Sequence, residues 1–402
     1  MKKILLLGGS SQQVIAIQKA KSLGYYTVLC DFLSDNPGQN YCDKFYLVST
    51  TDLKGVLKIA IDEKVDGIVA YSSDPAAPTA AFVADKLGLA GIPYGVAECF
   101  CNKNLFRSFL KEYSFNVPSS LSFDYNGNSL PNLSSLKPPL IIKPTDSSGS
   151  KGVTVIEDLK DLPEACDCAI KHSRSKRLII EEFIQRDHPE VIEAEIFVID
   201  SKVVVWGLIS SIRDELTNPL IPAAYSYPIN LSESRINIVK NEIKRLVNCS
   251  GVTNGAFNLE MIITKEDKLY FLDVGPRNGG NMLPEFIGMI GGVDLTSATI
   301  LNSMGELNAK SEFSMNGHDG GVWGLYVIHS LHDGILKNVH FDTLAKSCLI
   351  KVEYFKPFGS FVKRFNDSRD AIGLAFFKFP NVAYRDIVLN DFKGEHIVLE
   401  IG

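Results

Sequence analysis

Two carboxylates within one short stretch of the chain have the spacing of a catalytic pair. Glu260 and Asp273 each interrupt an apolar run, 257 to 263 and 269 to 274, and the polar turn between the runs predicts a β-hairpin. A carboxylate inside a buried strand is costly unless a partner satisfies it. A divalent cation held between the strands would satisfy both, because Mg²⁺ prefers oxygen ligands. The alternative is that both are salt-bridged or half-exposed strand residues.

The Pro-Arg-Asn-Gly-Gly segment after the hairpin favours the catalytic interpretation. Arg277 carries a fork of donors suited to phosphate or carboxylate, and Gly279 and Gly280 let backbone amides approach an anion closely. Metal ligands, an anion fork and a glycine turn therefore lie within about 20 residues, as in a phosphoryl-transfer site.

Composition and charge restrict the class of protein. The 402 residues are 45% hydrophobic and 22% charged, as in an ordered globular protein of two or three domains. A net charge of −6 without a block of Lys or Arg argues against a nucleic-acid or membrane-surface role. The eight cysteines lack redox or zinc spacing, which predicts reduced thiols in a cytoplasmic protein. No apolar run approaches a membrane span, and the one at the N-terminus is too short for a signal peptide.

The first 100 residues alternate between short apolar strands and helical segments. This alternation predicts a parallel, doubly wound α/β sheet. Strands are expected at 4–7, 27–30 and 67–71, and helices at 14–23, 56–61 and 76–87. Gly8-Gly9, followed about 20 residues later by Asp31, partly matches a dinucleotide fingerprint, but the third glycine of that motif is missing. We interpret this turn as structural or substrate-contacting.

A loop rich in serine and glycine is a second candidate site. Lys143 ends an expected strand, 140–143, and residues 147–152 read Ser-Ser-Gly-Ser-Lys-Gly before a second strand, 153–156. Such a loop offers backbone N–H groups and hydroxyls to phosphates, and the lysine supplies a charge. It is not a Walker P-loop, since the residue order differs and a strand follows. A flexible hairpin tip is the alternative.

The elements between residues 101 and 305 predict an α+β unit. Expected helices cover 105–113 and 232–246, and expected strands cover 120–123, 178–184, 196–199 and 203–210. After residue 305, strands are expected at 320–330, 349–355, 371–379 and 396–401. The pair His329 and His332 matches neither strand periodicity nor a zinc pair with further ligands, so a structural role is expected.

Taken together, these motifs resemble the ATP-grasp superfamily of carboxylate-amine ligase type, which includes amino-acid ligases and the carbamoyl-phosphate-synthase and biotin-carboxylase branch. The matching motifs are Lys103, Ile-Ile-Lys143-Pro, the Ser-Ser-Gly-Ser-Lys-Gly loop, Ile-Glu-Glu-Phe-Ile, Asn-Leu-Glu260 and Leu-Asp273-x-x-x-Arg277-x-Gly-Gly. The resemblance implies a Rossmann-like pre-ATP-grasp domain over 1–100, an ATP-grasp domain over 101–305 and a small β-rich domain over 306–402.

The resemblance implies an ATP-dependent ligase. Such an enzyme joins a small carboxylate to an amine through an acyl-phosphate and releases ADP and phosphate. ATP and Mg²⁺, or Mn²⁺ in its place, would be the cofactors, and a homodimer the assembly. A bicarbonate-using amine carboxylase of the same fold and a non-catalytic ATP-binding module are the alternatives.

The resemblance also assigns roles to individual residues. Those expected to bind the nucleotide are Lys103, Lys143, Ser147, Ser148, Gly149, Gly152, the hinge residues Glu181, Glu182, Phe183 and Ile184, and Glu193 at the ribose. Those expected to act in metal binding and catalysis are Glu260 and Asp273 as metal ligands and Lys143, Arg277 and Asn278 as catalytic residues. Substrate contacts are expected near Ser10, Asp74, Thr79, Arg213 and residues 217–225.

One position departs from the family pattern. Members usually have Glu-x-Asn-x-Arg where this chain has Asp273-Val-Gly275-Pro-Arg277, so the asparagine metal ligand is absent. Either Asn278, Asn281 or water compensates, since Mg²⁺ normally keeps several waters, or the second metal site is weakened.

Overall fold

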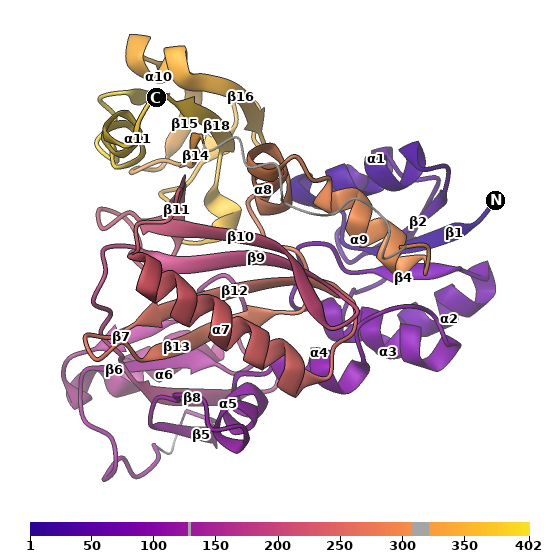
Figure 1. The fold of residues 1–402 in the computed structure, drawn as a ribbon, viewed down its shortest axis with the longest axis horizontal. Coiled ribbons are helices and arrows are strands. Elements are labelled where there is room, and N and C mark those ends of the chain that lie inside the picture. The colour runs from indigo at the N-terminus through magenta and orange to yellow at the C-terminus, as the bar shows by residue number, and fades with distance from the viewer. Residues whose placement is uncertain (128–129, 308–320) are drawn as a thin grey trace.

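A computed structural model describes residues 1–127, 130–307 and 321–402 (Figure 1). The N-terminal unit is a parallel four-stranded sheet, as predicted, in the order β3 (Lys44–Leu47), β2 (Tyr26–Asp31), β1 (Lys3–Leu7), β4 (Gly67–Val69). Helices cover both faces because alternate residues of β1 point to opposite sides. Ile4 and Leu6 pack with α1 (Val14–Ser22), and Leu5 and Leu7 with α2 (Leu53–Glu63) and α3 (Ala77–Leu87).

The glycine turn after β1 is closed by the chain itself. The Gly9 N–H donates to Asp31 Oδ2 at 2.7 Å. The Gln13 side chain donates from Nε2 to Tyr71 O at 2.8 Å. The acidic group and helix start that a dinucleotide would use are therefore engaged within the protein, which supports the structural interpretation of this turn.

A continuous eight-stranded antiparallel sheet forms the centre of the molecule (Figure 1). Its order is β13 (Leu269–Gly275), β12 (Gly255–Ile263), β9 (Val191–Ile199), β10 (Lys202–Arg213), β11 (Pro222–Tyr227), β14 (Val322–Ile328), β18 (Gly373–Phe379), β16 (Leu349–Tyr354). The predicted hairpin is confirmed as β12 and β13, with Glu260 directly opposite Asp273. The strands of the C-terminal segment continue this sheet, and the domain boundary at residue 306 stays a prediction.

Helices bury both faces of the central sheet. The helix α7 (Glu233–Ser250) packs through Val239 and Ile243 on the face that carries Ile196, and α8 (Leu283–Gly291) packs through Phe286 on the face that carries Phe197. Every residue of β9 is buried. A carboxylate on this strand therefore has to be satisfied by protein groups.

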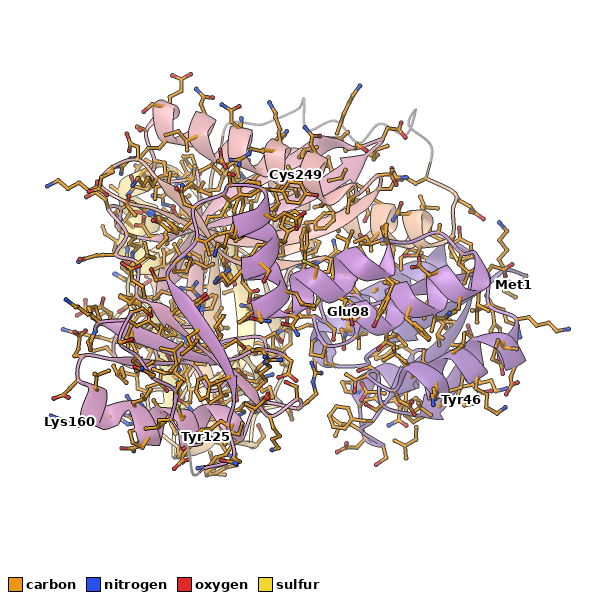
Figure 2. The ribbon with its side chains drawn as sticks, turned by 90° about the horizontal axis from the view of Figure 1, so that it is seen from below. Met1, Tyr46, Glu98, Tyr125, Lys160 and Cys249 are labelled. Carbon is orange, nitrogen blue, oxygen red and sulfur yellow. The ribbon has the colours of Figure 1, made fainter. Side chains whose placement is uncertain are left out.

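A second antiparallel sheet lies beside the hairpin and carries the serine and glycine loop. Its order is β5 (Ser120–Asp124), β8 (Arg177–Glu182), β6 (Leu140–Pro144), β7 (Thr154–Ile156), and α6 (Leu162–Ile170) packs against it. Two helices, α4 (Tyr94–Cys101) and α5 (Lys103–Glu112), precede this sheet in the chain. Seen from below, Glu98 on α4 lies between the unit that carries Tyr125 and Lys160 and the unit that carries Tyr46 (Figure 2).

The C-terminal segment is β-rich but also contains helices that the sequence analysis did not predict. A three-stranded sheet has the order β17 (Phe361–Val362), β15 (Gly334–Phe341), β19 (Ile397–Ile401), and the helices are α10 (Thr343–Cys348) and α11 (Val382–Leu389). The remaining helices are α9 (Leu295–Ser303) and the short 3-10 turns Ser11–Gln13, Pro37–Asn40, Leu159–Asp161 and Ser368–Asp370. The start of the strand expected at 320 lies outside the described residues. No helix in the described ranges is long and apolar enough to cross a membrane.

Candidate active site

A cavity of about 510 Å³ lies between the antiparallel sheet of β5, β8, β6 and β7 and the β12–β13 hairpin. The walls come from α5, β6, β8, the serine and glycine loop, β12 and β13. Ten of the predicted site residues line it: Lys103, Lys143, Ser147, Ser148, Glu181, Glu182, Phe183, Ile184, Glu260 and Asp273. The structure therefore brings together residues that lie up to 170 positions apart in the chain.

A buried ion network fixes one wall of the cavity. Glu181 Oε2 accepts from Lys143 Nζ at 2.6 Å, and Glu181 Oε1 accepts from Arg107 Nε at 2.6 Å. Arg107 also donates to the carbonyls of Phe271 and Leu272 on β13. Burial raises the pKa of Glu181, but Arg107 and Lys143 outweigh it and hold the pKa well below its usual range. Lys143 is thus oriented by Glu181, a role that the hinge motif did not indicate.

Lys103 links the start of α5 to the hairpin and to the loop. Its Nζ donates to Asp273 Oδ2 at 2.9 Å and to Ser147 O at 3.2 Å. Burial lowers the pKa of Lys103, but Asp273 outweighs it and the pKa is raised. Only 10% of the Lys103 side chain is exposed, so this lysine is part of the cavity wall and not of the outer surface.

The donor set at the hairpin fits one hard cation. Asp273 and Glu260 stand opposite each other on neighbouring strands, and 40% and 31% of their side chains are exposed on the cavity wall. Over the described part of the chain, no group of three or more His, Cys, Asp or Glu side chains converges on one point. Two carboxylates completed by phosphate oxygens and water match the usual coordination of Mg²⁺.

The serine and glycine loop follows the cavity rim through some of its residues only. Ser147 and Ser148 line the cavity, and Ser150 Oγ donates to Leu220 O at 2.7 Å. Gly149 and Gly152 have φ angles of +65° and +70°, which favour glycine. Neither lines the cavity, so the structure places both glycines where they shape the loop.

The hinge segment, residues 181–184, lines the cavity, and so does a histidine that follows it in the chain. The Glu182 N–H donates to Ser119 O at 2.9 Å, so this N–H is already engaged within the protein. His188 also lines the cavity and was missed in the sequence. Its Nε2 accepts from the Ile263 N–H at 3.0 Å, so Nδ1 carries the proton and donates to Glu190 O at 2.5 Å. Burial lowers the pKa of His188, which keeps the ring neutral.

Glu193 lies on β9, the strand next to the hairpin in the same sheet, and it is not among the residues that line the cavity. It stands opposite Glu260 on the central strand β9 and is 2% exposed, and its Oε1 accepts from Asn258 Nδ2 at 3.0 Å. Burial, followed by the charge of Glu260, raises the pKa of Glu193 to about 7. This position gives no support to the ribose contact that was predicted for Glu193.

Glu195 holds the turn that follows the hairpin. Its carboxylate accepts from Asn278 Nδ2 at 3.1 Å and from the Gly279 N–H at 2.8 Å. Asn278 Oδ1 in turn accepts from Thr299 Oγ1 at 2.8 Å, and Asn278 is 1% exposed. The structure therefore places Asn278 in the scaffold of the turn, outside the cavity lining. Burial raises the pKa of Glu195 to about 8, although Asn278 and Gly279 oppose this shift.

Arg277 joins the turn to the N-terminal unit. Its Nη2 donates to Asp74 Oδ2 at 2.5 Å and its Nη1 donates to Asn278 O at 3.0 Å. Nearby, Ser72 Oγ donates to Gly279 O at 2.7 Å. Asp74, one of the residues expected near the substrate, is thus at the site. Ser10 instead caps its own helix through Gln13, and Thr79 is buried in α3.

The predicted structural role of the C-terminal histidine is supported by its partners. His329 Nε2 lies 3.0 Å from Asp214 Oδ2, and Nδ1 lies 2.6 Å from Val327 O. His329 is 5% exposed, so both contacts are buried. This pair attaches the segment after β10 to β14.

The cavity between a four-stranded antiparallel sheet and a carboxylate-bearing hairpin, next to a Rossmann-like unit, defines the class of ATP-grasp ligases. A family model described as "Carbamoyl-phosphate synthase L chain, ATP binding domain" matches residues 102–305, and the chain belongs to this family. The predicted fold class and the resemblance to the ATP-grasp superfamily are confirmed.

Curated relatives and solved structures agree with this assignment. The formate-dependent phosphoribosylglycinamide formyltransferase of Prochlorococcus marinus (strain NATL2A) is 28% identical over 283 residues, which cover 69% of this chain and 70% of that protein. The carbamoyl phosphate synthase large chain of Pseudothermotoga lettingae is 23% identical over 69% of this chain and 26% of that protein. An L-amino acid ligase from Bacillus licheniformis superposes with a TM-score of 0.81 at 19% identity, covering 100% of this chain and 99% of that one. That likeness shows the fold.

Proposed function

We propose that this chain is an ATP-dependent carboxylate-amine ligase that forms an amide or peptide bond through an acyl-phosphate. The observation that carries the proposal is the single cavity into which two buried lysines, the hinge, the loop and the two hairpin carboxylates converge. Mn²⁺ as a substitute for Mg²⁺, a homodimer, a cytoplasmic location and the domain boundaries at residues 100 and 305 are further elements of the proposal.

On this proposal the nucleotide lies along the wall formed by β6, β8 and the loop. Lys143 and Lys103 contact phosphate oxygens, and Ser147 and Ser148 donate from the rim. Both lysines are held by carboxylates at 2.6 and 2.9 Å before any nucleotide arrives. Preorganised charges of this kind stabilise a developing phosphoryl charge without reorganising in the transition state.

Glu260 and Asp273 would hold Mg²⁺, which supplies charge neutralisation at the phosphates when bound. Arg277, which Asp74 holds beside the cavity, would steady the carboxylate that receives the phosphoryl group.

The reaction has two displacements. A substrate carboxylate oxygen takes the γ-phosphoryl group, which breaks the bond to ADP and forms an acyl-phosphate. The amine nitrogen then attacks the carbonyl carbon, a C–N bond forms, phosphate leaves and the amine loses its proton. The loop anchored through Ser150 would exclude water from the acyl-phosphate while it waits for the amine.

The first experiment measures ADP and phosphate release from Mg-ATP across pools of amino acids, amino sugars and small carboxylates, formate included, with and without bicarbonate. Release that requires one carboxylate and one amine is the expected result and names the substrates. Release that depends on bicarbonate alone would replace the proposal with the amine carboxylase. ATP binding without release in any pool would replace it with a non-catalytic module.

A further inference from the structure

The place of the asparagine in the family pattern is filled by an ion pair in this chain. A Cβ built on Gly275 would lie 2.5 Å from Asp74 Oδ1 and 2.7 Å from Arg277 Cζ, whereas real Cβ contacts essentially never fall below 3.0 Å. No side chain fits at position 275 unless this pair moves. The Asp74–Arg277 pair therefore occupies the space that an asparagine side chain at position 275 would take.

The pair is a fixed feature that lies beside the metal-binding wall. Gly275 ends β13, two residues after Asp273, and the guanidinium of Arg277 lies over Gly275 from the segment that follows the strand. Only 13% of the Arg277 side chain and 20% of the Asp74 side chain are exposed. Burial lowers the pKa of Arg277, but Asp74 outweighs it and the pKa is raised, so the positive charge is permanent.

The charge of the cavity is already balanced for a nucleotide with one metal ion. Six basic residues line it, namely Lys103, Arg107, Lys143, Lys151, Arg186 and Arg213, against four carboxylates, Glu181, Glu182, Glu260 and Asp273. The excess of two positive charges matches the net charge of about −2 of ATP with one Mg²⁺. The Asp74–Arg277 pair lies outside this lining and adds no net charge to the balance.

We propose that the Arg277 guanidinium, held over Gly275 by Asp74, takes the place of a second metal ion, so that the chain binds one divalent cation per nucleotide. This inference rests on the proposed function, because it assigns the single cation to Glu260 and Asp273. Asp74 is then a positioning residue, through which the N-terminal unit sets the location of a charge beside the ATP-binding cavity.

The test counts bound Mn²⁺ by electron paramagnetic resonance, in the full-length protein saturated with a non-hydrolysable ATP analogue. One ion per chain is the expected result, and two ions per chain would overturn the inference. Analogue binding without any bound Mn²⁺ would instead show that the proposed metal ligands are wrong. The two failures are therefore distinguishable.

A pair of matched variants tests the guanidinium itself. Arg277→Ala with Gly275→Asn removes the cation and returns the amide oxygen of the family pattern, and it should bind two Mn²⁺ ions. Arg277→Ala with Gly275→Ala removes the same cation without adding a ligand, and it should bind one. A count of one in both would contradict the role of Arg277. Circular dichroism checks folding, and the count in the wild-type chain decides the question if either variant unfolds.

Discussion

The two sides of the cavity differ in how completely their charged groups are paired. On the nucleotide side, Lys103, Lys143 and Arg107 each contact a carboxylate at 2.6 to 2.9 Å. Around Glu260 and the turn after β13, which we call the acceptor side, four buried polar atoms have no hydrogen-bond partner among the described residues: Asp74 Oδ1, Glu193 Oε2, Arg213 Nη1 and Arg277 Nε. Of these four residues, Arg213 lines the cavity and the other three lie behind its wall. Both sides include residues of the β12–β13 hairpin or next to it, and both contain buried groups. They differ in whether the buried polar atoms have hydrogen-bond partners.

The difference indicates how each side treats its ligand. A paired network is preorganised, and it receives a ligand of constant shape, the ATP phosphates, without rebuilding. An unpaired buried donor or acceptor costs about 1–3 kcal/mol until a partner arrives. A substrate that pairs with these atoms gains this free energy, and one that lacks the matching groups does not. We infer that specificity resides on the acceptor side.

Removing Glu181, the carboxylate that pairs with both Arg107 and Lys143, should have the largest effect on stability. Glu181→Ala leaves Arg107 and Lys143 buried without their carboxylate, and it should lower the free energy of unfolding by about 3–5 kcal/mol. Urea denaturation measures this, and calorimetry should show loss of ATP-analogue binding. Glu182→Ala, at the next and exposed position, is the matched control. A change of the same size in both variants would contradict the assignment of Glu181.

Neutralising the carboxylate that faces the nucleotide should affect catalysis more than folding. Asp273→Asn removes the charge that Lys103 contacts and that the metal needs, so ADP release should fall by about 100–1000-fold. Asp267→Asn, in the exposed turn of the same hairpin, should leave the rate unchanged. A normal rate in the Asp273 variant would exclude Asp273 as a metal ligand.

Glu195, which holds the turn after the hairpin, should make the stability of the protein depend on pH. Since the pKa of Glu195 is raised to about 8, the folded chain keeps a proton that the unfolded chain releases above the ordinary pKa of glutamate. The free energy of unfolding should therefore fall as the pH rises from about 5 to 8, by an amount on the order of a few kcal/mol. Glu195→Gln should flatten this dependence in urea denaturation at each pH, and Glu233→Gln, at the exposed start of α7, should not.

Changing the acceptor side should give the smallest effect, and one confined to the acceptor. Arg213 has an unpaired Nη1, and its Nη2 lies 3.5 Å from Glu260 Oε2. Arg213→Ala should raise the KM for the acceptor substrate by about 10-fold, since one hydrogen bond to a charged group is worth about 1.5 kcal/mol, and leave the KM for ATP unchanged. Equal increases in both KM values would remove the distinction between the two sides.

Most of the nucleotide side could be predicted from the sequence, because its motifs are local. The hairpin follows from two apolar runs around a polar turn, and the loop from its composition. Arg107 could not be assigned, since its carboxylate lies 74 positions away and an arginine on an amphipathic helix carries no distinguishing pattern. Asp74 and Arg277 are 203 positions apart, so the reason for Gly275 emerged only from the fold.

The buried carboxylates of β9 illustrate a different limit. Glu193 and Glu195 alternate with apolar residues as a half-exposed strand would, and the family resemblance implied a ribose contact for Glu193. The strand is in fact central in an eight-stranded sheet that is covered on both faces, and both side chains are buried. Periodicity gives the face of a residue but not the number of layers above it.

The continuous central sheet also limits how the enzyme can move. Main-chain hydrogen bonds join β13 to β16 across eight strands, so we expect the C-terminal strands and the hairpin to be displaced together as one rigid body. The smaller sheet of β5, β8, β6 and β7 is separate, and it carries Lys143, the hinge and the loop. Opening and closing of the cavity would then be a rotation of the smaller sheet relative to the central sheet. We expect amide hydrogen exchange to be fastest in the segments that connect the two sheets.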